Sequence, residues 1–228
     1  MHVEILYRPS YSLAVVKLSP SESVMAESGA MVSMSHGMTL ETQASGGIIK
    51  SLARSFFGGE SFWQNLYTAP GEGGEITFAP PLAGDMFFLD LDNESLIVQS
   101  GSFVACEPTV SLNTKWGGAK MFFASEGLTM LQAAGKGKLI LSSYGAIHEK
   151  NLGAGELLTV DTGHLVAFTE GVQFNVRRLG NLKSTILGGE GLVVDLAGPG
   201  RVLIQTRSTQ SFLSWLFRKL PKRSGGGT

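Results

Sequence analysis

A single pattern of residues occurs three times along the chain. In each occurrence a glutamate is followed seven residues later by a glycine, and nine residues further on by an apolar residue. The glutamates are Glu22, Glu94 and Glu156, the glycines are Gly29, Gly101 and Gly163, and the apolar residues are Met38, Val110 and Val172. A fixed internal period is typical of a protein built from repeated structural units. The chain is therefore predicted to fold as three copies of one unit.

A second pattern follows in register with the first and supports the same division. A glutamate leads into an apolar run, then a Gly-x-Gly step, then a second apolar run, in places alternating with polar residues. The glutamates are Glu60, Glu126 and Glu190, and the steps are Gly71/Gly73, Gly135/Gly137 and Gly198/Gly200. We place the repeats at about 12–84, 85–144 and 145–210, packed as one compact domain over residues 1–210.

Each predicted unit is typical of β-structure. Runs of four to eight residues rich in Val, Ile, Phe, Thr and Leu are bounded by Gly, Pro, Ser and Asp. The chain holds 30 glycines among 228 residues, and only 16% of its residues are charged. Because glycine adopts positive φ without steric cost, we expect the Gly-x-Gly steps to form hairpin turns. The predicted fold class is all-β, with three tandem β-sandwich repeats.

The recurring glutamates have two interpretations. The favoured one is that they accept backbone N–H groups at turns just before an apolar run. The alternative is that one set converges on a pseudo-threefold axis and holds a cation, which requires inward-facing carboxylates.

Two stretches depart from the β pattern. In the first repeat, apolar residues share one face of a predicted short amphipathic helix that is inserted in the repeat. These residues are Ile48, Ile49, Leu52 and Phe56. Residues 211–221 predict an amphipathic C-terminal helix with Ser211 as its N-cap and Pro221 at its end. A flexible Gly-rich tail is expected over residues 222–228.

The C-terminal helix carries the most specific indication of a partner. Its apolar and basic residues fit a helix that lies on an anionic membrane surface. The residues expected to make this peripheral contact are Phe212, Trp215, Leu216, Arg218 and Lys219. The favoured interpretation is that the apolar stripe covers the β core or a neighbouring subunit, and membrane contact is the alternative.

Composition argues against several classes of protein. The formal net charge of −1 creates no positive field, so no nucleic-acid partner is expected. The chain has no run of 18 apolar residues and no visible targeting signal, so we expect a soluble, cytoplasmic protein. The single cysteine, Cys106, excludes an intrachain disulfide and is predicted to be a buried thiol.

The residues that usually carry catalysis form no recognisable site. The chain has four histidines but no His-x-His pair. His164 lies near Asp161 in sequence, and we interpret it as a turn histidine with a local hydrogen bond. No serine has a credible base nearby, and no Gly-rich segment has phosphate-loop spacing. We therefore predict no catalytic, cofactor-binding or metal-binding residues, and we expect the protein not to be an enzyme.

Several of these segments together resemble a known family. They are residues 58–62, 160–167, 189–192, 198–200 and 204–207, with the Gly-rich tail. The chain resembles prokaryotic members of the family that includes the mitochondrial biogenesis protein known from altered inheritance of mitochondria. The resemblance implies a fold similar to the tryptophan RNA-binding attenuation protein, of double-stranded β-helix type, packed into an oligomer. It supplies no catalytic motif, and the tryptophan- and RNA-binding residues of the attenuation protein are not placed on this chain.

The leading hypothesis is a non-enzymatic oligomeric β scaffold, with a homotrimer favoured, that serves membrane-associated organisation or partner binding. The alternative is a small-ligand-binding module with its ligand between repeats or subunits. A metal-dependent enzyme is the weakest hypothesis.

Overall fold

The computed structural model describes residues 1–44, 63–113, 129–179 and 192–220, and within them the chain is an all-β protein with one α-helix. The first third holds β1 (His2–Leu6), β2 (Leu13–Leu18), β3 (Ser23–Glu27), β4 (Met31–Met34), β5 (Thr39–Ala44), β6 (Trp63–Thr68) and β7 (Gly74–Phe78). The middle third holds β8 (Met86–Gln99), β9 (Phe103–Cys106), β10 (Val110–Asn113) and β11 (Met130–Ser142). The last third holds β12 (Ile147–Leu152), β13 (Leu157–Asp161), β14 (Leu165–Thr169), β15 (Gln173–Arg178), β16 (Leu192–Ala197) and β17 (Gly200–Gln205), followed by α3 (Thr209–Lys219). Two 3₁₀ turns, η1 (Ser100–Ser102) and η2 (Thr162–His164), precede β9 and β14.

The first and last thirds share one order of antiparallel pairing. In one sheet, β7 lies between β2 and β4, as β17 lies between β12 and β14. In a second sheet, β6 lies between β3 and β5, as β16 lies between β13 and β15. In the middle third the long strands β8 and β11 pair along their whole length, and β9 and β10 pair with different parts of β11. Tandem duplication of an attenuator-protein-like sandwich stays a prediction.

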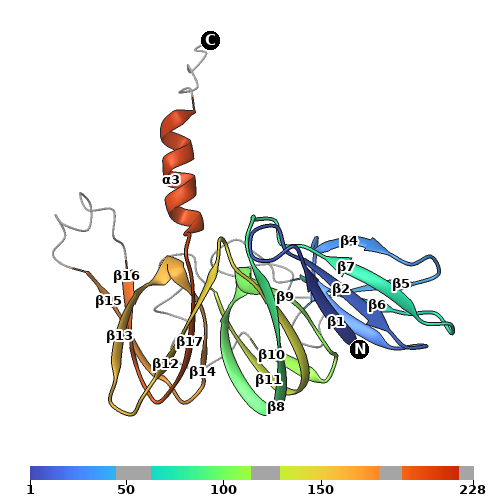
Figure 1. Cartoon of the computed structure of the whole chain (residues 1–228), viewed down its shortest axis with the longest axis horizontal. Helices are drawn as coiled ribbons and strands as arrows, with labels where there is room; N and C mark the ends of the chain where they lie inside the picture. The colour runs from blue at the N-terminus through green and yellow to red at the C-terminus, as the bar shows by residue number, and fades with distance from the viewer. Residues whose placement is uncertain (45–62, 114–128, 180–191, 221–228) are drawn as a thin grey trace.

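Strand pairing also joins the thirds side by side into a row (Figure 1). β9 of the middle third pairs with β3 of the first, and β14 of the last third pairs with β8 of the middle. These joins create a sheet of ten strands that runs through the molecule. A four-stranded sheet, β1-β2-β7-β4, and a three-stranded sheet, β13-β16-β15, remain outside it.

The prediction that the Gly-x-Gly steps form hairpin turns was wrong. At the first and last steps the chain leaves one sheet and enters another, since β6 and β7, like β16 and β17, belong to different sheets. In the middle third, Gly135 and Gly137 lie inside the continuous strand β11, with φ of +129° and +147°, at a shift in strand register. A Cβ atom on Gly135 would lie 2.5 Å from the carbonyl oxygen of Thr109. Glycine is required there because the bent strand approaches its neighbour too closely for a side chain.

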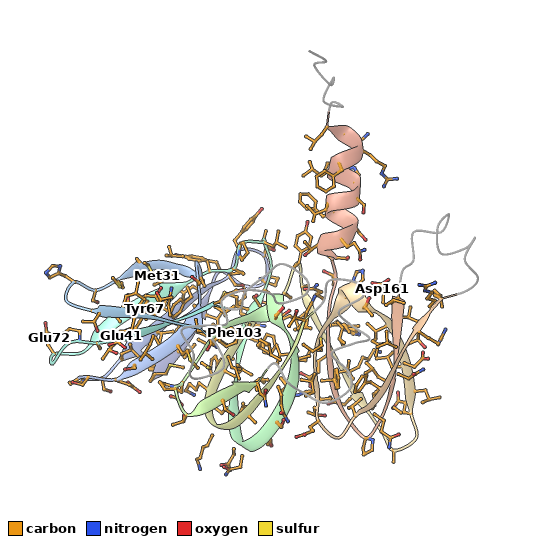
Figure 2. The ribbon with its side chains drawn as sticks, turned by 180° about the vertical axis from the view of Figure 1, so that it is seen from behind. Met31, Glu41, Tyr67, Glu72, Phe103 and Asp161 are labelled. Carbon is orange, nitrogen blue, oxygen red and sulfur yellow. The ribbon has the colours of Figure 1, made fainter. Side chains whose placement is uncertain are left out.

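Each third encloses a cluster of buried apolar side chains. Tyr67 and Phe103 are among the largest fully buried side chains, and both lie inside the β body (Figure 2). Some side chains cross between thirds: Val104 of β9 belongs to the cluster of the first third, and Val166 of β14 belongs to that of the middle third. The row is therefore held together by shared apolar cores as well as by strand pairing.

The predicted C-terminal helix is present as α3, with a different N-cap from the one expected. The backbone N–H of Ser211 donates to the hydroxyl of Ser208, so Ser208 caps the helix and Ser211 lies in its first turn. The helix predicted around residues 48–56 and the tail over 222–228 lie outside the described residues.

Candidate functional site

Three side chains that the sequence singled out, those of His164, Asp161 and Cys106, are either hydrogen-bonded to the backbone or buried. The Nδ1 atom of His164 lies 2.7 Å from the carbonyl oxygen of Gln205, whereas Asp161 accepts the backbone N–H of Gly163 at 2.8 Å. His164 thus bonds to β17, not to the nearby carboxylate. Cys106 is fully buried, as predicted, and burial raises the pKa of its thiol far above the usual value. In the part of the chain that the structure describes, no group of three or more His, Cys, Asp or Glu residues is placed to hold a metal ion.

Two of the recurring glutamates accept turn N–H groups, as the favoured interpretation predicted. Glu22 accepts the N–H of Ser19 at 2.8 Å, and Glu156 accepts that of Gly153 at 2.9 Å. Partial burial acts to raise the pKa of Glu22, but bonds from the N-terminal ammonium and from Ser19 outweigh it and lower that pKa. Glu94 and Glu156 are exposed, so this set forms no inward-facing ring. The second set, Glu60, Glu126 and Glu190, lies outside the described residues.

A buried carboxylate ties the turn between β1 and β2 to the start of β8. Asp85 accepts two bonds from the Arg8 guanidinium, at 2.8 and 2.9 Å, and further bonds from the Ser12 hydroxyl and the Met86 N–H. Burial acts to raise the pKa of Asp85, but the bonds from Arg8 and from the other donors hold it below its usual value. The arrangement anchors a loop.

Helix α3 projects from the β body, and the expectation that its apolar stripe covers the core of its own chain was wrong (Figures 1 and 2). None of its residues is buried. Its exposed apolar residues are Leu213, Trp215 and Phe217, with Phe217 65% exposed, and the C-cap residue Leu220 is exposed as well. Arg218 and Lys219 occupy its last turn, and its first turn holds no acidic residue. The helix therefore presents an apolar and basic surface that the described residues of its own chain do not cover.

The root of α3 rests on the body through aromatic contacts. The ring of Phe212 packs edge-on against Tyr144, at 6.0 Å between centroids, and stacks on Trp215 at 6.1 Å. An open hollow of about 330 Å³ lies beside these rings, with His164 and Arg207 also in its lining. Aromatic faces beside a guanidinium give the hollow both apolar and cationic character.

Among the described residues, β4 and β13, at opposite ends of the row, each have one unpaired edge, as do β1, β5, β10, β12 and β15. β4 pairs with β7 alone, and β13 pairs with β16 alone. Val32 and Met34 on β4 are 58% and 40% exposed, and Leu157 on β13 is 75% exposed. Exposed apolar side chains on an open strand edge favour the addition of a strand from another chain.

Sequence reasoning identified α3 but missed the two open edges. Both edges lie in segments that the repeat pattern covers, and nothing in their residue types separates them from the paired strands. The available signal was positional: Val32, Val104 and Val166 each follow a repeated glycine by three residues. Only the pairing of the strands shows that Val32 lacks the surroundings of the other two.

Comparison with known proteins places these features in a family context. A family model described as "Mitochondrial biogenesis AIM24" matches residues 3–207. An uncharacterized protein of Streptococcus pyogenes serotype M6 is 26% identical over 222 residues, which cover 94% of this chain and 89% of that protein. The altered inheritance of mitochondria protein 24 of Verticillium alfalfae is 27% identical over 167 residues, which cover 73% of this chain and 43% of that protein.

A solved structure supports the fold. The crystal structure of a Streptococcus pyogenes protein matches with a TM-score of 0.81 and 25% sequence identity, over 96% of this chain and 99% of that one. No helix among the described residues is long and apolar enough to cross a bilayer.

Proposed function

This chain belongs to the mitochondrial biogenesis AIM24 family, and we propose that it acts as a non-enzymatic, self-assembling β scaffold that docks on an anionic membrane surface through α3. The exposed apolar and basic face of α3 is the observation that carries the proposal. His164 and Asp161 each form a hydrogen bond with the backbone and Cys106 is fully buried, which supports a structural role for these three side chains.

The distribution of charge along the chain supports an anionic partner for the C-terminal segment. Residues 207–228 carry five basic side chains and no acidic one, whereas residues 1–206 carry 13 basic and 19 acidic side chains. A bilayer with anionic headgroups attracts residues 207–228 and repels residues 1–206. The segment therefore serves as the docking element, and the β body stays in water.

The geometry of α3 fits a helix at a membrane interface. Its 11 residues span roughly 16 Å, which is too short to cross the hydrocarbon core but sufficient to insert one face between headgroups. Leu213, Phe217 and Leu220 supply apolar surface, and Trp215 has the amphipathic ring that is enriched at membrane interfaces. The aromatic contact with Tyr144 fixes the root of the helix on the body.

Self-assembly multiplies this weak interaction. A single short helix binds lipid with modest affinity, whereas several helices on one assembly bind as a multivalent unit. We propose a homotrimer, in which three copies of α3 engage one surface. The two open strand edges support the association of copies.

Co-sedimentation with vesicles tests the docking. We expect the full chain to bind phosphatidylcholine vesicles that contain 30% phosphatidylglycerol (an arbitrary, roughly physiological fraction) and to bind pure phosphatidylcholine far more weakly. Arg218→Gln/Lys219→Gln should weaken binding by about 2 kcal/mol, since each basic residue near such a surface contributes about 1 kcal/mol. Lys17→Gln/Lys150→Gln, which removes two exposed lysines from β2 and β12, is the matched control and should bind as wild type does.

The apolar contribution has its own variant. Leu213→Ser/Phe217→Ser removes exposed apolar surface from α3, and Leu40→Ser removes it from β5. The first should reduce sedimentation with anionic vesicles, and the second should not. Equal binding of wild type and both α3 variants would show that the helix is not the docking element.

A small-ligand-binding module is the second candidate function, favoured by the hollow beside Tyr144, Phe212 and Trp215. Arg207 in its lining suits a ligand with an aromatic ring and an anionic group. Native mass spectrometry of the purified protein tests this candidate. We expect the wild-type protein to retain a bound small molecule as added mass, and Trp215→Ala to abolish that added mass. A protein that carries no adduct at any protein concentration contradicts it.

A further inference from the structure

The two joins between thirds share one register when counted from the repeated glycines. In the first join, Ala105 and Cys106, four and five residues after Gly101, pair with Ala26 and Met25, three and four residues before Gly29. In the second join, Ala167 and Phe168 occupy the same offsets after Gly163, and they pair with Val98 and Ile97 at the same offsets before Gly101. The joining strands therefore meet in the same way twice.

A bulged valine accompanies each join. The register between β9 and β11 shifts after Phe103, and that between β14 and β17 shifts after Leu165, so Val104 and Val166 occupy equivalent bulges. Both valines are at most 1% exposed, and each packs in the apolar cluster of the neighbouring third. The join thus combines strand pairing with a valine inserted into the adjoining core.

The first third carries the same bulge without a join. The register between β4 and β7 shifts between Met31 and Ser33, which places Val32 at the bulge, and Val32 is 58% exposed. At the other end of the row, β13 occupies the place in its third that β3 and the end of β8 occupy in theirs. Among the described residues it has no strand on its free edge. Each end of the row therefore carries one of the two strands that form a join, and we call β4 with Val32 and β13 the two half-joins.

We propose that β4 of one copy adds to β13 of a second copy as an antiparallel strand, with Ser33 opposite Val160 and Met34 opposite Thr159. These pairs follow from the offsets that both internal joins share. Val32 then inserts into the last third of the second copy, as Val104 and Val166 insert within one chain. This inference rests on the self-assembly of the proposed function and names the surface that produces it.

A second copy is the partner because the two half-joins complement each other but lie at opposite ends of the molecule. Figure 1 shows β13 at one end of the row and β4 at the other, so one chain cannot pair them with each other. The contact is head-to-tail, which generates a closed ring when the rotation between copies permits closure. The homotrimer proposed above is such a ring, and every join in it, within and between chains, is of one kind.

Cross-linking between two differently substituted proteins tests the register. Met34→Cys protein is mixed with Thr159→Cys protein and oxidised with copper phenanthroline, because paired Cα atoms lie within the range that a disulfide spans. We expect a disulfide-linked dimer. Met34→Cys mixed with Leu157→Cys, two residues along the same strand, is the matched control and should cross-link far less. The native Cys106 is fully buried and does not compete. Equal cross-linking of both mixtures, or none in either, overturns the proposed register.

A charged substitution at the bulge tests the join without disturbing the fold of one chain. Val32→Lys places an ammonium where the join buries a side chain, and it should raise the dissociation constant of the assembly by about 10- to 100-fold. Leu40→Lys, at a similarly exposed site on β5, should leave the assembly unchanged. Sedimentation velocity reads out both. An assembly that survives Val32→Lys overturns this inference but not the proposal that the protein self-assembles. A loss of vesicle binding without a loss of assembly bears only on the docking proposal.

Discussion

Replacing the bulged valines by alanine should lower the stability of a single chain at the paired positions and leave it nearly unchanged at the unpaired one. Val104 and Val166 are at most 1% exposed, whereas Val32 is 58% exposed. Alanine removes two methyl groups, which is worth roughly 1.6 kcal/mol when they are fully buried. The cavity that remains adds up to about 1 kcal/mol. Val104→Ala and Val166→Ala should therefore each lower the free energy of unfolding by about 2 kcal/mol.

Val32→Ala should not change the stability of a single chain beyond about 0.5 kcal/mol, because its side chain is already in water there. Its cost should appear only in association, as a rise in the dissociation constant of the assembly. Urea unfolding followed by circular dichroism, at protein concentrations above and below that constant, separates the two effects. If Val32→Ala destabilises the dilute protein as much as Val104→Ala does, Val32 has a partner within its own chain and the reasoning fails.

Three further outcomes follow from particular contacts. Gly135→Ala, at φ +129° and in close contact with a carbonyl, should cost about 1–3 kcal/mol in urea unfolding, whereas Gly71→Ala, which meets open space, should be nearly neutral; equal costs would contradict the requirement for glycine at the β11 bulge. Because the pKa of Asp85 is lowered by Arg8 and the other donors, its stabilisation should be full above the unfolded carboxyl pKa of about 3.9 and fade as pH falls below it. Asp85→Asn should accordingly be less stable than wild type at pH 7 by about 1–2 kcal/mol, with the difference shrinking in acid, and a constant difference would refute the linkage. The Cys106 thiol should not react with Ellman's reagent in the native protein and should react fully in urea, so rapid native reaction would contradict its burial.

Local features of the fold followed from residue types and spacing. The β-rich composition predicted an all-β chain, and the stripe around Phe212 and Leu216 predicted α3. Glu22 and Glu156 accept turn N–H groups because a carboxylate just before an apolar run can reach the backbone three residues earlier. Each of these predictions depends only on interactions between residues close in sequence.

Features that depend on distant pairing were beyond the same reasoning. A Gly-x-Gly step has the same sequence pattern at a hairpin turn and at a bulge inside a strand, so Gly135 was assigned to a turn although it lies inside β11. The N-cap is Ser208 and not Ser211 because the helix begins at Thr209, and either serine has the side chain to cap a helix. Val32 and Val104 are the same residue at the same place in the pattern, and only the presence of β3 beside β9 distinguishes them.

In the scaffold that we propose, the assembly and docking surfaces are separate. β4 and β13 lie at the two ends of the row (Figure 1). Helix α3 projects from the body, and its root contacts Tyr144. Assembly through the strand edges therefore leaves each copy of α3 free. Substitutions in α3 should therefore abolish docking and leave assembly intact. Substitution of Val32 should abolish assembly and leave the α3 surface intact.

Native mass spectrometry of the wild-type protein tests the central claim of head-to-tail self-assembly most directly. At micromolar concentration we expect one dominant species with three times the mass of a single chain, and we expect Val32→Lys to convert it to single chains. A wild-type spectrum that shows only single chains over the whole range of concentration would contradict the account.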